Sequence, residues 1–177
     1  TYPAASTFKA FVSSGALAYD IATKKSKYTC TGTWTGFGED YPQNCWLLSG
    51  HGEMDVVSGI ANSCDVVFYE IGKAFYEKAD ELGDDCLQRY IETFGFGSVT
   101  GIDIYGEAAG RIPTPAWKAE YFKDVPEEAE WVGGDMSNMS IGQGYVLVTP
   151  LQMCCAYCGI ATGTIYKPHL LKEVRNS

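Results

Sequence analysis

Three features are missing from this sequence, and each absence excludes a class of protein. No apolar run approaches the roughly 18 residues of a membrane-spanning helix, and no signal-peptide pattern opens the chain. The 13 basic residues are outnumbered by 22 acidic ones, which gives a net charge of −9, and no segment concentrates the basic residues. Nucleic acids and anionic membrane surfaces are therefore poor candidates for partners.

The composition that is present is typical of one globular domain. The chain has 177 residues, 46% of them hydrophobic and 14% aromatic, which is enough to bury a core and excludes a disordered protein. No internal repeat or low-complexity tract interrupts it. The chain starts at Thr1 rather than at a methionine, which suggests a piece excised from a longer protein.

Hydrophobic spacing predicts a mostly α structure with few strands of its own. Apolar residues recur three and four positions apart in several segments, as on one face of a helix. Thr149 and Pro150 add an N-cap and a first-turn proline. Five helices are predicted. One begins near Ser6, one covers about 54–61, one begins near Asp65, one begins after Asp84, and one runs from Pro150 to about Ala161.

The segments between these helices are predicted to be irregular. Residues 24–50 lack a clean period and form a long loop with a short hairpin around 31–36. Residues 95–135 are punctuated by glycine and proline, which predicts loops with small helical turns. Residues 165–174 are expected to approach a strand.

The first candidate for chemistry is the S-x-x-K sequence at Ser6 and Lys9. Residues three apart on a helix share a face, so the Lys9 amine can take the proton of the Ser6 hydroxyl without a histidine. Ser6 also lies near the positive end of the helix dipole, which favours developing negative charge. By itself the motif is a weak signal and is better explained by a helix cap beside a solvated lysine.

The second candidate is Ser63-Cys64-Asp65, which falls between two predicted helices. In isolation this triplet is an ordinary N-cap, in which Ser63 or Asp65 satisfies the first N–H groups of a helix. Together with Ser6 and Lys9 it completes a recognisable set of groups.

These motifs resemble the penicillin-binding protein transpeptidase domain. YPAASTFK resembles the S-x-x-K motif of that family, and SCDVVFYEIG resembles its S-x-N motif with the following helix. The stretches GHGEMDVVSGIANSCD, FGFGSVTGIDI and MSIGQGYVLVTPLQM agree, in order, over nearly the whole chain. The likeness is greatest to elongation-type class B enzymes, some of which carry aspartate as the third residue of the second motif.

The resemblance implies acyl transfer on D-Ala-D-Ala stem peptides, which cross-links peptidoglycan. Ser6 is the implied nucleophile, Lys9 its general base and Ser63 a proton relay, while Asp65 hydrogen-bonds substrate or lysine. Burial favours the neutral amine that a base requires, whereas the Asp65 carboxylate favours the ammonium, and the sequence leaves the balance open. β-Lactam antibiotics are implied ligands of Ser6.

The third family motif, K-T-G, is absent from the 177 residues. We therefore expect residues 1–177 to be the helical portion of an α/β serine-transpeptidase domain that stops before the K-T-G strand. Such a fragment should be catalytically silent, because that strand supplies a carboxylate-binding group and part of the oxyanion hole. The implied parent is anchored by an N-terminal transmembrane helix at the extracytoplasmic face of the bacterial membrane, and works with a glycosyltransferase and elongation-complex proteins.

Cys30, Cys45, His51 and Cys64 form a candidate metal site. Three thiols and an imidazole suit tetrahedral zinc, and some elongation-type members resemble this arrangement, with a structural zinc held by the same loop. A Cys30–Cys45 disulfide is an alternative outside the cytoplasm, and Cys64 is equally explained as a small buried side chain.

The other cysteines carry no predicted chemistry. Cys154, Cys155 and Cys158 lie on the last predicted helix among apolar residues, and we expect them to pack in the core. Three other functions remain open: a β-lactam-sensing domain, a serine β-lactamase, and a zinc-bound folding unit without activity of its own.

Overall fold

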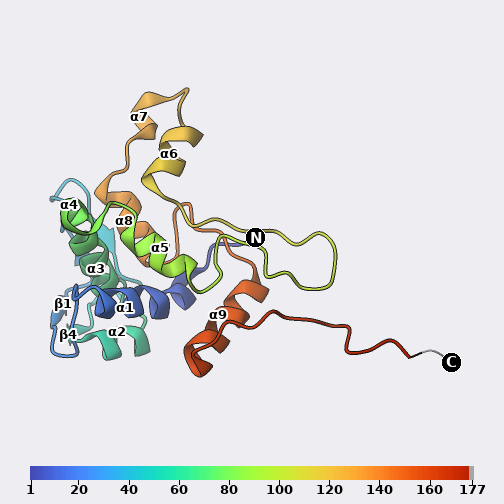
Figure 1. The fold of residues 1–177 in the computed structure, drawn as a ribbon. Helices are drawn as coiled ribbons and strands as arrows, with labels where there is room; N and C mark the ends of the chain where they lie inside the picture. The colour runs from blue at the N-terminus through green and yellow to red at the C-terminus, as the bar shows by residue number, and fades with distance from the viewer. Residues whose placement is uncertain (176–177) are drawn as a thin grey trace.

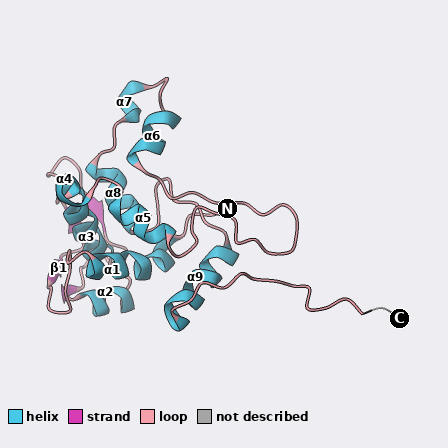
Figure 2. Cartoon of the chain, viewed as in Figure 1, coloured by secondary structure: helices cyan, strands magenta, loops and turns pink. Residues whose placement is uncertain are grey.

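The computed structural model describes residues 1–175, and helices make up most of its regular structure (Figure 1, Figure 2). The helical elements are η1 (Ala5–Phe8, a 3₁₀ turn), α1 (Lys9–Ala18), α2 (Val56–Ala61), α3 (Asp65–Glu77), α4 (Ala79–Leu82), α5 (Cys86–Glu92), α6 (Pro115–Tyr121), α7 (Pro126–Ala129), α8 (Gly133–Ser140) and α9 (Pro150–Thr162). The strands are β1 (Tyr28–Cys30), β2 (Thr33–Trp34), β3 (Gln43–Asn44) and β4 (Gly52–Met54). The predicted mostly α class is confirmed.

Helix α3 is the centre of the core. Its apolar face is buried at positions such as Val67, Phe68 and Ile71, and it packs against α8, α1, α2 and β1. Gly72 allows α8 to come close, because a Cβ there would lie 3.0 Å from the Ser140 hydroxyl oxygen. Burial of this apolar face, rather than helix propensity, is what stabilises α3 in place.

Two short antiparallel ladders organise the long loop after α1. In one ladder Cys30 of β1 pairs with Gly52 of β4, and in the other Trp34 of β2 pairs with Gln43 of β3. The predicted hairpin at 31–36 is therefore wrong, because β2 pairs with β3 across a loop of eight residues, 35–42. Strand β1 of one ladder and strand β2 of the other both contact α3.

The rest of the chain extends from this helical body (Figure 1). Helices α6 and α7 project from one end of it, while α9 and the C-terminal tail lie at another. The tail returns to the loop after α5, where the Leu170 and Leu171 amides donate hydrogen bonds to Asp103. None of the described helices combines the length and the apolar character needed to cross a bilayer.

Several local predictions need correction. Met54 belongs to β4, so the helix expected at 54–61 starts at Val56, and α8 was not predicted at all. Residues 165–174 form no strand within the described part of the chain. The core position predicted for three cysteines is wrong, because Cys154 and Cys158 are exposed and Cys155 is half-buried. Helix α9 turns Cys154 and Cys158 away from the core.

Candidate active site

The amine of Lys9 lies at the junction of α1 and α3 and is almost completely buried, with 1% of the side chain exposed. It donates hydrogen bonds to the Ser63 carbonyl oxygen at 2.8 Å, the Ser63 hydroxyl at 3.1 Å and Asp65 Oδ1 at 2.6 Å. The ring of Phe68 lies 5.3 Å below it. Three donors meeting three acceptors is the arrangement of a lysine ammonium.

The turn between α2 and α3 places these acceptors. Helix α2 is closed at its start by a capping box between Asp55 and Ser58, and ends before Ser63. Ser63 adopts the left-handed backbone conformation, with φ of 51°. This conformation reverses the chain within two residues, so that the Ser63 carbonyl and hydroxyl and the Asp65 carboxylate can all reach Lys9.

Ser6 lies one helical turn before Lys9, on the exposed side of η1. All three hydrogen bonds of the Lys9 amine go to residues 63 and 65, and within residues 1–175 we find none between it and the Ser6 hydroxyl. Ala5 immediately before Ser6 also has a left-handed backbone, with φ of 50°. The structure thus brings Lys9, Ser63 and Asp65 into direct contact and leaves Ser6 open at the adjoining surface.

A glycine turn holds the segment that carries Ser6. The Ala5 amide donates to the Gly142 carbonyl oxygen at 2.8 Å. Gly142 has φ of 72°, and a Cβ there would lie 2.3 Å from the Ala5 carbonyl oxygen. Only glycine fits this position, which is consistent with the Gly142-Gln143-Gly144 sequence acting as a support for the rim of the site.

Trp46 is a member of the site that the sequence did not indicate. Its backbone amide donates to Asp65 Oδ2 at 3.0 Å, and its indole donates to the Asn62 carbonyl oxygen at 3.0 Å. Asp65 thereby bonds Lys9 with one oxygen and the long loop with the other. The one sequence signal for Trp46 is its position next to Cys45, because nothing in the spacing links position 46 to position 65.

Beside this turn, Cys30, Cys45, His51 and Cys64 converge with their ligand atoms all within 4.8 Å of one another. His51 Nδ1 lies 3.6 Å from the Cys30 sulfur and 3.5 Å from the Cys45 sulfur. The three thiols are buried and none forms a disulfide, so the alternative Cys30–Cys45 bond is not present. These four residues could hold a metal ion.

The thiols of this cluster differ in their acidity. Burial raises the pKa of Cys30, but hydrogen bonds from the backbone and ring of His51 and from Gly32 outweigh it and lower that pKa to about 7. Burial dominates at Cys64 and, with the neighbouring thiols, raises its pKa to about 12. A thiol that is partly ionised at neutral pH, beside the protonated thiol of Cys64, is poised to bind a cation.

Comparison with known proteins agrees with this geometry. A family model described as the penicillin binding protein transpeptidase domain matches residues 1–177. The chain is 36% identical to peptidoglycan D,D-transpeptidase MrdA of Salmonella typhimurium over 171 residues, which cover 96% of this chain and 26% of that protein. The chain therefore spans about a quarter of the length of the curated relatives it matches.

Solved structures give the same result. Pseudomonas aeruginosa PBP2 in complex with WCK 5153 is similar with a TM-score of 0.85 and 29% identity, over 97% of this chain and 37% of that one. The complex of PBP2 and MreC from Helicobacter pylori is similar with a TM-score of 0.82 and 30% identity, over 95% of this chain and 29% of that one. By sequence along its whole length, and by fold, the chain belongs to the penicillin-binding protein transpeptidase domain family.

Proposed function

We propose that the protein is a serine D,D-transpeptidase of the elongation-type class B group, which cross-links peptidoglycan stem peptides ending in D-Ala-D-Ala. The observation that carries this proposal is the contact of Lys9 with both Ser63 and Asp65, one helical turn from the exposed Ser6 hydroxyl. The names of the curated relatives, which are peptidoglycan D,D-transpeptidases, support the same reaction.

In the first step the Ser6 oxygen bonds to the carbonyl carbon of the penultimate D-Ala. The proton of Ser6 passes to Lys9 and, through the Ser63 hydroxyl, to the nitrogen of the terminal D-Ala. The C–N bond then breaks, and the terminal D-Ala leaves as a neutral amine. The hydrogen bond of 3.1 Å between Lys9 and Ser63 provides the path for this transfer.

In the second step an amine from a neighbouring stem peptide attacks the ester carbonyl. Its nitrogen bonds to the carbon, the bond to the Ser6 oxygen breaks, and a proton returns from the amine to that oxygen. A β-lactam ring would acylate Ser6 in the same way as the first substrate. The reaction requires Lys9 in its neutral form, so one of its three hydrogen bonds must be given up before it accepts a proton.

We propose further that residues 1–177 are the helical part of a longer transpeptidase domain, whose K-T-G strand completes the site. The parent protein is expected at the extracytoplasmic face of the bacterial membrane, held by an N-terminal transmembrane helix. Its proposed partners are a glycosyltransferase and proteins of the elongation complex. The H. pylori relative bound to MreC supports partners of this class.

The reaction is tested on a protein that carries this chain together with the K-T-G strand. We expect a fluorescent penicillin to label it covalently, and the Ser6→Ala variant to lose the label while keeping its melting temperature. The purified protein should also form cross-linked product from stem peptides, which a β-lactam sensor or a β-lactamase would not. Labelling that persists in Ser6→Ala would disprove the assignment of the nucleophile.

The Cys/His cluster is proposed to hold zinc in a structural role. Zinc bonds of about 2.3 Å to sulfur and about 2.0–2.1 Å to nitrogen, at a tetrahedral angle, place sulfur and nitrogen about 3.5 Å apart. The distances from His51 Nδ1 to Cys30 and Cys45 are 3.6 and 3.5 Å. A bound ion would supply a fixed crosslink between the loop and Cys64. Cys64 is the N-cap residue of α3 and lies between Ser63 and Asp65 in the sequence.

Native mass spectrometry of the chain tests the metal. We expect one zinc per chain, lost on chelation, and a Cys45→Ser variant that binds it at least tenfold more weakly. Chelation should also make the 31–50 loop more sensitive to protease, a change that is independent of activity. Cys158→Ser is the matched control, since that exposed thiol lies outside the cluster. A chain without zinc that resists protease equally well would contradict the proposal.

A further inference from the structure

Two adjoining hollows lie at the C-terminal end of α3, away from the candidate active site. Their volumes are about 490 and 340 Å³, and Tyr76 lines both. Val132 lines the larger and its chain neighbour Trp131 the smaller. We call this pair of hollows the Tyr76 groove; its defining residues are Phe37, Tyr41, Gln43, Tyr76, Asp80 and Trp131.

The larger hollow has aromatic walls. Phe37 packs edge-on against Tyr76 with ring centroids 5.7 Å apart, and it also contacts Trp34. Tyr41 is 71% exposed and Val132 44%, so the apolar surface stays open to solvent. Grooves lined by aromatic rings bind proline and other bulky apolar side chains of extended peptides, because flat rings give contact area at little entropic cost.

Each hollow is also lined by a residue with a buried polar side-chain atom that has no hydrogen-bond partner within residues 1–175. These are the side-chain carbonyl oxygen of Gln43 in the larger hollow and the indole N–H of Trp131 in the smaller. Both atoms are buried behind the surface of the hollow, so a ligand reaches them only by displacing the side chains that cover them, and pairing then removes the cost of leaving them unsatisfied. One acceptor and one donor along a groove match the N–H and C=O groups of an extended backbone.

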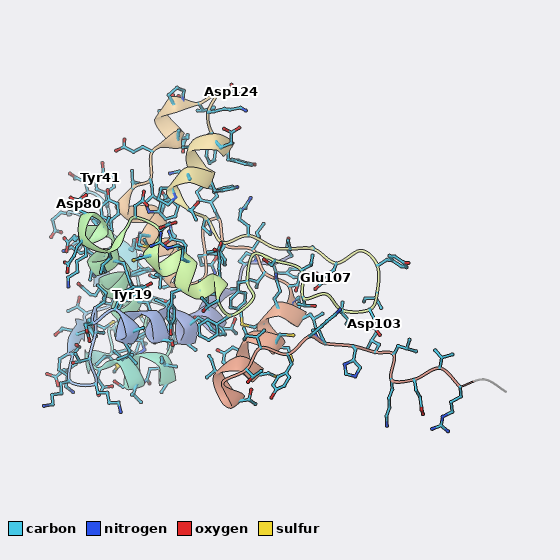
Figure 3. All side chains as sticks on the ribbon, viewed as in Figure 1. Tyr19, Tyr41, Asp80, Asp103, Glu107 and Asp124 are labelled. Atoms are coloured by element: carbon cyan, nitrogen blue, oxygen red, sulfur yellow. The ribbon has the colours of Figure 1, made fainter. Side chains whose placement is uncertain are left out.

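The smaller hollow is acidic. Glu77, Asp80 and Asp84 line it, and no lysine or arginine does. Glu77 pairs with Lys73 at 3.7 Å, whereas Asp80 and Asp84 form no ion pair within the described residues. Figure 3 shows Tyr41 and Asp80 at the same edge of the molecule, so the larger, apolar hollow adjoins the smaller, acidic one. This charge favours a basic ligand.

We propose that the Tyr76 groove binds an extended segment of a partner protein that carries proline or another bulky apolar residue next to lysine or arginine. The apolar residue lies between Phe37, Tyr41 and Tyr76, and the basic side chain reaches Asp80 and Asp84. Helix α3 has 13 residues, about 20 Å, which separate the groove from Ser63 at its other end. The partner therefore binds without covering the candidate active site.

Fluorescence anisotropy tests this with two labelled decapeptides of alternating proline and leucine, one ending in two arginines and one in two glutamates. We expect the 177-residue chain to bind the arginine peptide at least tenfold more tightly at low salt. Trp131→Phe, which keeps the ring but removes the donor, should raise the dissociation constant about fivefold. The double variant Asp80→Asn/Asp84→Asn should remove most of the preference for arginine.

Asp124→Asn is the matched control, because this exposed carboxylate lies between α6 and α7 (Figure 3) and should leave binding unchanged. Asp80 and Asp84 are exposed, so their variants are expected to fold as the parent does, which circular dichroism verifies. Equal affinity for both peptides, absence of binding, or binding that is unaffected by the double variant would each overturn the proposal. So would concentration-dependent dimers that are disrupted by Trp131→Phe, since the occupant would then be a second copy.

Discussion

At the scale of single residues, Lys9 is a buried lysine whose hydrogen bonds are all made. Its amine is buried, and each of its three donors has an acceptor from one short turn. A buried ion pair contributes little net stability compared with an apolar pair, but removing one partner leaves an uncompensated charge. Lys9 is therefore expected to stabilise the contact between α1 and α3 as well as to act in catalysis.

Replacing Lys9 with methionine tests the structural part of this role. Lys9→Met keeps most of the volume but leaves the Asp65 carboxylate unpaired, so we expect the free energy of unfolding in urea to fall by about 3 kcal/mol. Lys24→Met is the control, because the exposed Lys24 side chain should change stability by less than about 0.5 kcal/mol. Equal losses in the two variants would show that Lys9 is not a structural contact.

Sequence reasoning reached this site only in part. Ser6, Lys9, Ser63 and Asp65 were named from two short motifs, and the structure places three of them in contact. Trp46 could not be found, because its hydrogen bonds to Asp65 and Asn62 depend on how the long loop folds back. Local patterns indicate which groups are present, whereas tertiary contacts decide which of them meet.

At the scale of elements, the Gly142 turn connects the end of α8 to the segment before Ser6. We expect Gly142→Ala to destabilise the fold by more than about 2 kcal/mol, since it combines a positive φ with a Cβ 2.3 Å from the Ala5 carbonyl oxygen. Gly163→Ala is the matched control: its φ is 74°, but no atom lies within 4 Å. That variant should cost about 1 kcal/mol in thermal or urea unfolding. Similar losses at both sites would mean that the close approach to Ala5 is unimportant.

The C-terminal tail is attached to the loop after α5 through Asp103. Hydrogen bonds from the Leu170 and Leu171 amides lower the pKa of Asp103 below its usual 3.8. A lowered pKa means that this attachment is fully present above pH 3.8 and is lost as the pH falls through the folded-state value. We expect hydrogen exchange at the two amides, corrected for its intrinsic rate, to accelerate below pH 3.8.

Asp103→Asn is the companion variant, because its amide weakens the same attachment at every pH. Exchange at the two amides should then be faster at neutral pH and should show little further acceleration in acid. Acid-induced exchange of the same size in this variant would indicate that another group attaches the tail.

Helices with clear local sequence signals are the ones that the sequence predicts correctly. Helix α9 was predicted from Thr149 and Pro150, and the structure has the corresponding capping box with Gln152. Helix α8 was missed because its sequence, GGDMSNMS, has two glycines and no apolar period, so it depends on packing against α3. The sequence misplaces the thiols of α9, because its apolar composition predicts burial on every side, whereas Cys154 and Cys158 are exposed.

At the scale of the whole molecule, the described chain contains one contiguous core but no Lys-Thr-Gly sequence. Losing a single oxyanion donor lowers a rate by about 10²–10³-fold, and the proposed K-T-G strand would supply substrate contacts as well. We therefore expect the 177-residue chain alone to show no covalent labelling by fluorescent penicillin over hours. Labelling at Ser6, located by mass spectrometry of its tryptic peptide, would show that these helices suffice for acylation.

The left-handed backbones of Ala5 and Ser63 have a consequence for engineering. Non-glycine residues hold such conformations at a cost of about 1–3 kcal/mol each, which the surrounding packing must offset. Consensus or computational redesign for heat resistance will tend to select glycine at both positions, since that relaxes the chain. Glycine at position 5 would loosen the segment that carries the Ser6 hydroxyl, and glycine at position 63 would delete the hydroxyl of the proposed relay, so a more robust protein would be obtained at the expense of turnover.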